Sequence, residues 1–436
     1  IVQAAIEIQH DRTEPIIGLL QGRKPLSDDY SVMRYGPSAL LAIAYAAAGR
    51  HADAVRCLDD SPIPEQDRDD EMALVVEGSR TLCLLLEGRV RDAERSGSVQ
   101  HARAVAVHGH RSVSAYSSAS SLADAFYELD RIDEAREVLA NRIGLMQWAM
   151  PETMIRATIS RARLDLLQES PGAATAFLQR QERHFRTMEQ DRGVVHCLAE
   201  ELRIALLESD RATATDRLAK LEVLGTKHQA SLGFQAEIPA VVGIARARLL
   251  LASNYPDKAL QALAEVRAYT QQYSRGQMDV AALLLMAIAH ADLRQHEQEK
   301  ALLLQAVHQG CALGLVRTFL DLGPALGKQL GRLNDKLGEE GEVAGYLAEL
   351  LARFNHNQSS NLEGEAGGGS AQSLLTPREL AVLQLISQAM SNKRVALTLN
   401  ISLETVKWNL KNIYVKLGVS SRYDAVSWAR NQGLIE

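Results

Sequence analysis

The sequence predicts an all-α protein in which an α-solenoid of helical hairpins is followed by a small four-helix domain. Three observations support this fold class. Aromatic residues make up only 5% of the 436 residues, and the chain is rich in Ala, Leu, Arg and Glu, which lose little entropy in a helix; this composition disfavours an all-β sandwich or barrel. A hairpin-sized repeat runs through most of the chain. Helix-capping signals divide the C-terminal part into four short helices.

The repeat is a four-position pattern: a small residue, an aromatic or apolar residue three positions later, a turn residue at seven and an alanine at twelve. Its clearest copy is Ala42, Tyr45, Gly49 and Ala54. Further copies are Ala123, Phe126, Asp130 and Ala135; Ala247, Leu250, Asn254 and Ala259; and Ala289, Asp292, His296 and Ala301; weaker copies end at Ala93, Ala174 and Ala214. The terminal alanines recur every 39 to 45 residues.

Small residues at this spacing let two antiparallel helices cross closely, with the turn residue between them. The pattern therefore predicts about seven hairpins that bury their apolar faces on one another. The hairpins resemble the tetratricopeptide type, although the period is longer than the standard 34 residues. A generic antiparallel helical bundle is the alternative. The Gly-punctuated stretch from Gly310 to Gly345 is expected to cap the array.

Residues 355–373 are expected to form a flexible linker. They contain almost no large apolar side chain and a run of three glycines, so they cannot repay the entropy of ordering. The linker separates a helical-repeat domain, 1–354, from a C-terminal domain, 374–436. The net charge also differs between the two parts of the chain. Residues 374–436 carry eight Lys or Arg against four Asp or Glu, a net charge of +4, whereas residues 1–373 carry a net charge of −10.

Cap signals predict four helices in the C-terminal domain. Thr376, Pro377 and Glu379 form a capping box with Pro at the first helical position. The later N-caps are Ser391, Ser402 and Ser421, and Gly418 ends the third helix. A second helix, a short turn and a third helix have the spacing of a helix-turn-helix.

The third helix carries the residues that suggest a function. Its apolar residues at helical spacing predict a buried stripe; they are Val406, Leu410, Ile413 and Leu417. The opposite face carries Lys407, Trp408 and Lys411, and a short basic face of this kind suits the major groove of DNA. Lys393, Arg394, Lys416 and Arg422 lie near helix ends, where they can neutralise phosphates. A solvated charged face is the alternative.

From Leu375 to Glu436 the chain closely resembles the LuxR-type (LuxR/FixJ, GerE-like) DNA-binding domain of bacterial transcription regulators. The residues that carry the resemblance are Leu375, Thr376, Pro377, Arg378, Glu379, Val382, Leu383, Ser391, Asn392, Lys393, Ala396, Ser402, Thr405, Val406, Lys407, Asn412, Ile413, Lys416, Leu417, Val419, Arg422 and Ala425. The resemblance implies base contacts from Lys407, Trp408 and Lys411, and DNA-backbone contacts near Asn392, Lys393, Thr405 and Lys416. It also implies dimerisation through the fourth helix. Ala389 and Asn409 depart from it, standing where the family usually has Gly and His.

The order of repeat array and C-terminal domain is similar to that of the MalT-like, large ATP-binding LuxR regulators. In those regulators a nucleotide-binding domain precedes the repeats. In this sequence the Gly327-Lys328 pair lacks the spacing and the Ser or Thr of a P-loop. The resemblance implies the sensor and output half of such a regulator, with an inducer or a regulatory protein bound at the repeats.

Other functional classes have no support in the sequence. No apolar stretch approaches the roughly 20 residues that a membrane span needs, and no signal peptide is recognisable, so a cytoplasmic protein without membrane contact is expected. Four scattered cysteines predict reduced thiols, and no metal, cofactor or catalytic motif is recognised. We therefore expect a non-enzymatic, sequence-specific transcription regulator that binds double-stranded DNA as a homodimer, with RNA polymerase as a further candidate partner. The alternative is a protein-interaction scaffold with a non-functional DNA-binding domain.

Overall fold

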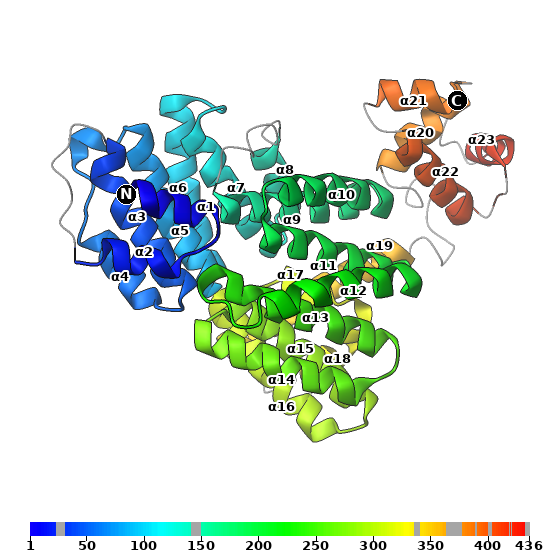
Figure 1. Cartoon of the computed structure of the whole chain (residues 1–436). Coiled ribbons are helices and arrows are strands. Elements are labelled where there is room, and N and C mark those ends of the chain that lie inside the picture. Colours follow the sequence, from blue (N-terminus) through cyan, green and yellow to red (C-terminus); the bar gives the residue numbers. More distant parts are fainter. Residues whose placement is uncertain are drawn as a thin grey trace.

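The computed structural model describes residues 1–22, 31–140, 150–334, 341–362 and most of 377–431, with residues 389, 400–402, 418 and 420 excepted. Within this part of the chain every regular element is a helix, which confirms the all-α prediction (Figure 1). None of the described helices is long and apolar enough to cross a membrane.

In the described residues between 31 and 313, which leave out 141–149, seven helical hairpins follow one another. They are α3 (Ser31–Ala47) with α4 (His51–Asp59), α5 (Glu71–Glu87) with α6 (Val90–His108), α7 (Val113–Glu128) with α8 (Ile132–Leu139), α9 (Pro151–Gln168) with α10 (Pro171–Thr187), α11 (Asp191–Leu207) with α12 (Arg211–Lys227), α13 (Glu237–Ala252) with α14 (Pro256–Tyr273), and α15 (Gly276–Asp292) with α16 (His296–Leu313). The first helices of successive hairpins pack side by side, α5 on α7, α7 on α9, and so on to α13 on α15. This is the neighbour-on-neighbour packing of a solenoid.

Short elements complete the repeat domain. Before the hairpins lie α1 (Val2–Gln9) and α2 (Glu14–Leu20); single 3₁₀ turns are η1 (Glu65–Asp67) and η3 (Gly233–Ala236); after the hairpins come α17 (Arg317–Leu320), α18 (Pro324–Asn334) and α19 (Glu342–Leu362). Several helix starts are fixed by side-chain caps. The Asp70 carboxylate, for example, accepts from the amides of Met72 and Ala73 at 2.9 and 3.0 Å.

The turns of the repeat follow the sequence pattern in three of its four clearest copies. Gly49, Asp130 and Asn254 have positive φ angles of 77°, 64° and 63°, and the alanine five residues after each is fully buried. The fourth copy was wrong by two residues, because Arg294 is the left-handed residue, α16 begins at His296 and Ala301 is exposed. The observed register, Ala287, His290, Arg294 and Glu299, has no alanine at its last position, where the buried residue is Glu299, so the pattern selected the wrong register.

The solenoid closes on itself at its two ends. Helix α15 contacts α5, and α17 contacts α7. A Cβ on Gly88 would lie 2.8 Å from the amide nitrogen of Gln277, and one on Gly276 would lie 2.7 Å from the carbonyl oxygen of Glu87. Arg275 adds hydrogen bonds across this junction to the carbonyl oxygens of Ala47 and Leu86, at 3.1 and 3.4 Å. The backbone at the end of α5 is therefore in direct contact with the backbone at the start of α15, where the solenoid completes a turn.

The last helix of the repeat domain extends beyond the expected boundary. Its inner face buries Tyr346, Leu347, Leu350 and Phe354, and the helix continues to Leu362. Residues 355–362, which we expected in the linker, are thus helical, since extending an anchored helix adds a hydrogen bond for each residue fixed. The remainder of that expected linker, 363–373, lies outside the described residues.

The C-terminal domain contains the four expected helices, α20 (Pro377–Ser387), α21 (Asn392–Thr398), α22 (Leu403–Leu417) and α23 (Arg422–Asn431). Ser391 Oγ accepts from the amide of Arg394 at 3.4 Å, and Ser421 Oγ accepts from that of Asp424 at 3.1 Å, so both caps are confirmed. The caps expected at Thr376 and Ser402 lie outside the described residues. The core of the domain consists of Val382, Leu383, Ile386, Val395, Ala396, Val406, Leu410, Ile413, Leu417, Ala425 and Ala429.

Candidate functional sites: the α22 face and a repeat-domain pocket

Helix α22 is held by its apolar stripe, as the sequence predicts. Val406, Leu410, Ile413 and Leu417 are all buried against α20, α21 and α23. Lys407, next to the first of them, is exposed. Trp408 and Lys411 lie on the same helix, but their side chains, like those of Thr405 and Lys416, are outside the described part of the chain. Asn409 is only 3% exposed, so this departure from the family pattern points into the domain.

The expected DNA-backbone contacts fall into two groups. Lys393 and Arg394 are exposed in the first turn of α21. Arg422 instead points into the domain: Nη1 donates to Asn392 Oδ1 at 2.9 Å, and Nη2 donates to the carbonyl oxygens of Ile386, at 3.3 Å, and Met390. The structure thus joins two of the predicted contact residues, Arg422 and Asn392, to each other.

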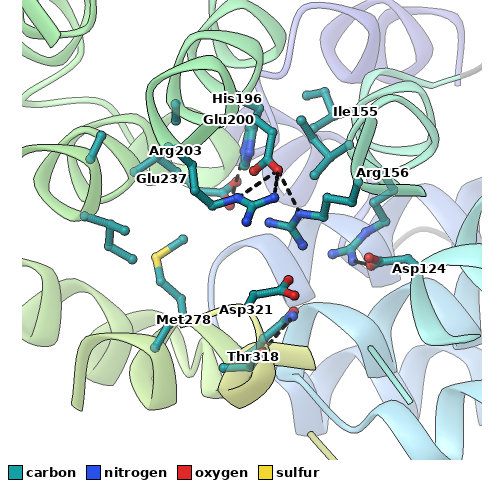
Figure 2. A pocket seen from close by; sticks show the side chains of 18 of the residues that line it. Asp124, Ile155, Arg156, His196, Glu200, Arg203, Glu237, Met278, Thr318 and Asp321 are labelled. Carbon is teal, nitrogen blue, oxygen red and sulfur yellow. Dashed lines mark hydrogen bonds and ion pairs between the residues drawn. The ribbon is translucent and has the colours of Figure 1, made fainter. Parts of the chain in front are cut away.

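A second candidate site is a cavity of about 230 Å³ inside the repeat domain. It is lined by the first helices of five successive hairpins, α7 to α15, together with residues 318–322 (Figure 2). Three of these helices contribute one face each, at the spacing i, i+4, i+7 or i+8, and i+11. The three sets are Glu152, Arg156, Ile159 and Arg163 on α9; Arg192, His196, Ala199, Glu200 and Arg203 on α11; and Glu237, Val241, Ile244, Ala245 and Arg248 on α13.

At one end of these faces the charges alternate from helix to helix. Arg192, on the middle helix, is fully buried and pairs with Glu152 on one neighbour and with Glu237, at 3.1 Å, on the other. It also forms two hydrogen bonds with Asp11 of the N-terminal segment, at 2.9 and 3.0 Å. Burial raises the pKa of Asp11 even though Arg192 opposes the shift. At this end of the pocket the buried arginine thus has three carboxylate partners within the protein.

At the other end all three helices present arginine. We call Arg163, Arg203 and Arg248 the arginine row. Glu200 is the carboxylate that these helices place among them: Arg203 donates to it at 2.5 and 2.9 Å, and Arg163 Nε lies 3.5 Å away. Burial favours the neutral acid, but Arg203 and Arg163 outweigh it and lower the pKa of Glu200 to about 2.

The opposite wall of the pocket carries three further acids, of which Asp124 pairs with Arg156. Asp321 already accepts a hydrogen bond from Tyr127 at 2.7 Å and pairs with Arg317. Glu128 accepts from the amides of Val316 and Thr318 at 3.1 and 2.8 Å. Burial raises the pKa of Glu128 to about 7, so at neutral pH this side chain supplies only a fraction of a negative charge.

Comparison with known proteins identifies the smaller of the two domains. Residues 373–429 match the luxR family of bacterial regulatory proteins. The C-terminal domain belongs to the luxR family.

Three relatives illustrate the wider similarity. The HTH-type transcriptional regulator AlkS of Ectopseudomonas oleovorans is 26% identical over 198 residues, which cover 44% of this chain and 22% of AlkS. The HTH-type transcriptional regulator MalT of Vibrio parahaemolyticus is 30% identical over 163 residues, 34% of this chain and 18% of MalT. The transcriptional regulatory protein LiaR of Bacillus subtilis is 35% identical over 96 residues, 22% of this chain and 40% of LiaR. The chain therefore aligns with about a fifth of the AlkS and MalT relatives.

Sequence reasoning located the luxR-family domain and its helices but missed the pocket. The three stripes on α9, α11 and α13 are visible in the sequence as charged residues at helical spacing. Each of them alone reads as a solvated helix face, which is the usual meaning of such a stripe. The missing information was that these faces stack side by side, and that follows from tertiary packing.

Proposed function

We propose that the chain is a sequence-specific, DNA-binding transcription regulator whose repeat domain senses an effector. The observation that carries the proposal is the luxR-family domain, in which the buried stripe of α22 leaves Lys407 on an exposed face. Relatives named as HTH-type transcriptional regulators support it. The cytoplasm, where bacterial promoters are found, is the corresponding location. No catalytic step is part of the proposal.

DNA binding in this scheme has two components. Lys393 and Arg394 on α21, with Lys416, would neutralise phosphates and give an affinity that falls with salt. Lys407, Trp408 and Lys411 on α22 would supply base preference in the major groove. A net charge of +4 for residues 374–436 is modest, so we expect two domains to bind together, with α23 as the dimer contact.

Two-fold pairing predicts inverted half-sites about one helical turn apart. An inducer or a regulatory protein would act at the repeat domain, and the bound dimer would contact RNA polymerase. The protein-interaction scaffold, with a non-functional C-terminal domain, is the competing function.

The test is selection of sequences from randomised duplex DNA by the full chain, at two salt concentrations. An enriched inverted repeat whose binding weakens steeply with salt is expected. Two matched variants separate the components: Lys407→Ala should relax base preference, whereas Lys393→Ala should weaken binding to all sequences alike and reduce the salt slope by about 1. No enrichment, with a partner protein bound equally well after deletion of residues 374–436, would favour the scaffold.

A further inference from the structure

The arginine row is an incompletely compensated concentration of positive charge inside the repeat domain. Arg163, Arg203 and Arg248 occupy the same position on three adjacent helices, eleven residues after Glu152, Arg192 and Glu237 respectively. Helices α9, α11 and α13 pack directly on one another, so the three guanidinium groups face one space. Figure 2 shows Arg203 and Glu200 beside that space, with Asp321 and Met278 on its other sides.

The charges around the row do not balance. Glu200 is shared by Arg203 and Arg163, and Asp321 is engaged by Arg317 and Tyr127. The three arginines of the row thus have a single carboxylate, Glu200, as an ion-pair partner among the described residues. Arg248 forms no hydrogen bond or ion pair with any residue in the part of the chain that the structure describes. Burial, together with repulsion from Arg203, lowers the pKa of Arg248 to about 10.

An unpaired cation in such a place costs stability unless something else compensates it. Arg192 differs, because at the other end of the same three helices it has three carboxylate partners: Glu152 and Glu237 on the neighbouring helices and Asp11 of the N-terminal segment. Arg163 is also incompletely paired, though less so than Arg248, since its Nε is buried without a hydrogen bond. Donors left free on guanidinium groups match the paired oxygens of a carboxylate or phosphate.

Part of the pocket wall is apolar. Ile155, Ile159, Val241, Ile244, Met278 and Leu322 line it between the two charged ends. A volume of about 230 Å³ admits a small molecule and not a folded partner or a peptide helix.

We propose that this pocket binds a small organic anion, an apolar body carrying a carboxylate or phosphate group, with the oxyanion held by the arginine row and Arg248 as its main partner. The inference deepens the effector-sensing part of the proposed function and rests on it for its biological meaning. Binding itself is a property of the repeat domain and does not require DNA.

The experiment measures thermal unfolding of the full chain without DNA, at fixed ionic strength. The probes are hexanoate, hexyl phosphate and uncharged hexan-1-ol. One of the two anions is expected to raise the Tm saturably, with hexan-1-ol having no such effect, and the anion that acts shows whether the natural ligand is a carboxylate or a phosphate. Equal shifts from hexan-1-ol, or no saturable shift from either anion up to 10 mM (an order-of-magnitude ceiling for a weak specific site), would overturn the proposal.

Two variants on helix α13 complete the test. Arg248→Gln should weaken the anion at least about tenfold, roughly 1.4 kcal/mol, while the Tm of the ligand-free chain stays the same or rises, because an unpaired charge has been removed. Arg246→Gln, whose side chain pairs with Glu222 outside the pocket at 2.5 Å, is the matched control and should bind as the unchanged chain does. Undiminished binding by Arg248→Gln would overturn the assignment.

Failure of this inference differs visibly from failure of the proposed function. A chain that selects an inverted DNA repeat and ignores both anions is a regulator without this site. If the chain binds the anion but selects no DNA sequence, the anion site is supported and the proposed DNA-binding function is contradicted.

Discussion

The guanidinium group of Arg422, at the first residue of α23, donates to the side chain of Asn392, at the first residue of α21, at 2.9 Å. The same group reaches the carbonyl oxygens of Ile386 and Met390. Three segments of the C-terminal domain are therefore fixed by one side chain. Because α23 is the expected dimer contact and α21 the expected phosphate contact, this interaction sets the spacing between the two surfaces.

Replacing Arg422 by alanine should destabilise the C-terminal domain. The change leaves two carbonyl oxygens and the Asn392 amide without their partner, at a cost of about 1–3 kcal/mol. Urea unfolding followed by the fluorescence of the domain's tryptophans measures it. Arg394→Ala is the matched control, because Arg394 is exposed on α21: it should change the free energy of unfolding by less than about 0.5 kcal/mol and reduce DNA affinity. Equal stability of the two variants would contradict the role given to Arg422.

Gly276→Ala should weaken the closure of the solenoid. The added Cβ would lie 2.7 Å from both the Glu87 carbonyl oxygen and Leu313 Cδ1, so backbone must move, at a cost of about 1–3 kcal/mol. Gly331→Ala in α18 is the control, since a Cβ there meets nothing within 4 Å and alanine favours a helix by about 0.5–1 kcal/mol. Thermal unfolding should therefore shift in opposite directions for the two variants.

Stability should depend on pH through Glu128. Burial raises its pKa in the folded protein to about 7 from an ordinary value of 4.5, so between these values the folded state holds a proton that the unfolded state has lost. The free energy of unfolding is then highest below pH 4.5 and falls as pH rises towards 7. Glu128→Gln, which cannot ionise, should flatten this dependence in urea titrations between pH 5 and 8. An identical slope in the variant would show that Glu128 is ionised in the folded protein.

Arg192→Met should be strongly destabilising even though methionine fills much of the same space. Asp11, Glu152 and Glu237 would remain buried without their common cation, and breaking a buried pair in this way costs about 3–5 kcal/mol. Arg180→Met, at an exposed position on α10, should change little. If methionine at position 192 proved neutral, the three carboxyl groups would have to take up protons in the folded protein, and the stability of that variant would then rise at low pH.

The parts of the fold that local chemistry determines were predictable. Ser391 and Ser421 begin helices where their hydroxyl groups cap them. The stripe of Val406, Leu410, Ile413 and Leu417 is buried as its spacing predicts. Local signals failed where the observed turn departs from the repeat pattern. In α15 the pattern is satisfied only with the turn at His296, whereas the observed turn residue is Arg294 and the buried position five residues later is Glu299 instead of alanine.

Long-range arrangements had no local signal. Gly88 and Gln277 lie close together although they are almost 190 positions apart in the sequence. In the sequence alone, Gly88 is explained by its place after a helix, where glycine commonly ends the helix, so nothing pointed to a distant contact. The arginine row was hidden for a similar reason. Arg163, Arg203 and Arg248 are separated from one another by 40 or more residues in the sequence. They form one group only because the three helices that carry them are stacked in register.

The contact between α5 and α15 changes how the repeat domain should come apart. In an open array each hairpin depends only on its two neighbours, so the ends fray first and unfolding spreads inward. Here the second hairpin and the seventh hold each other, and neither end is free to peel away alone. The domain should consequently unfold as a single cooperative unit, and amide hydrogens of α5 and α15 should exchange with solvent as slowly as those of α11 at its middle.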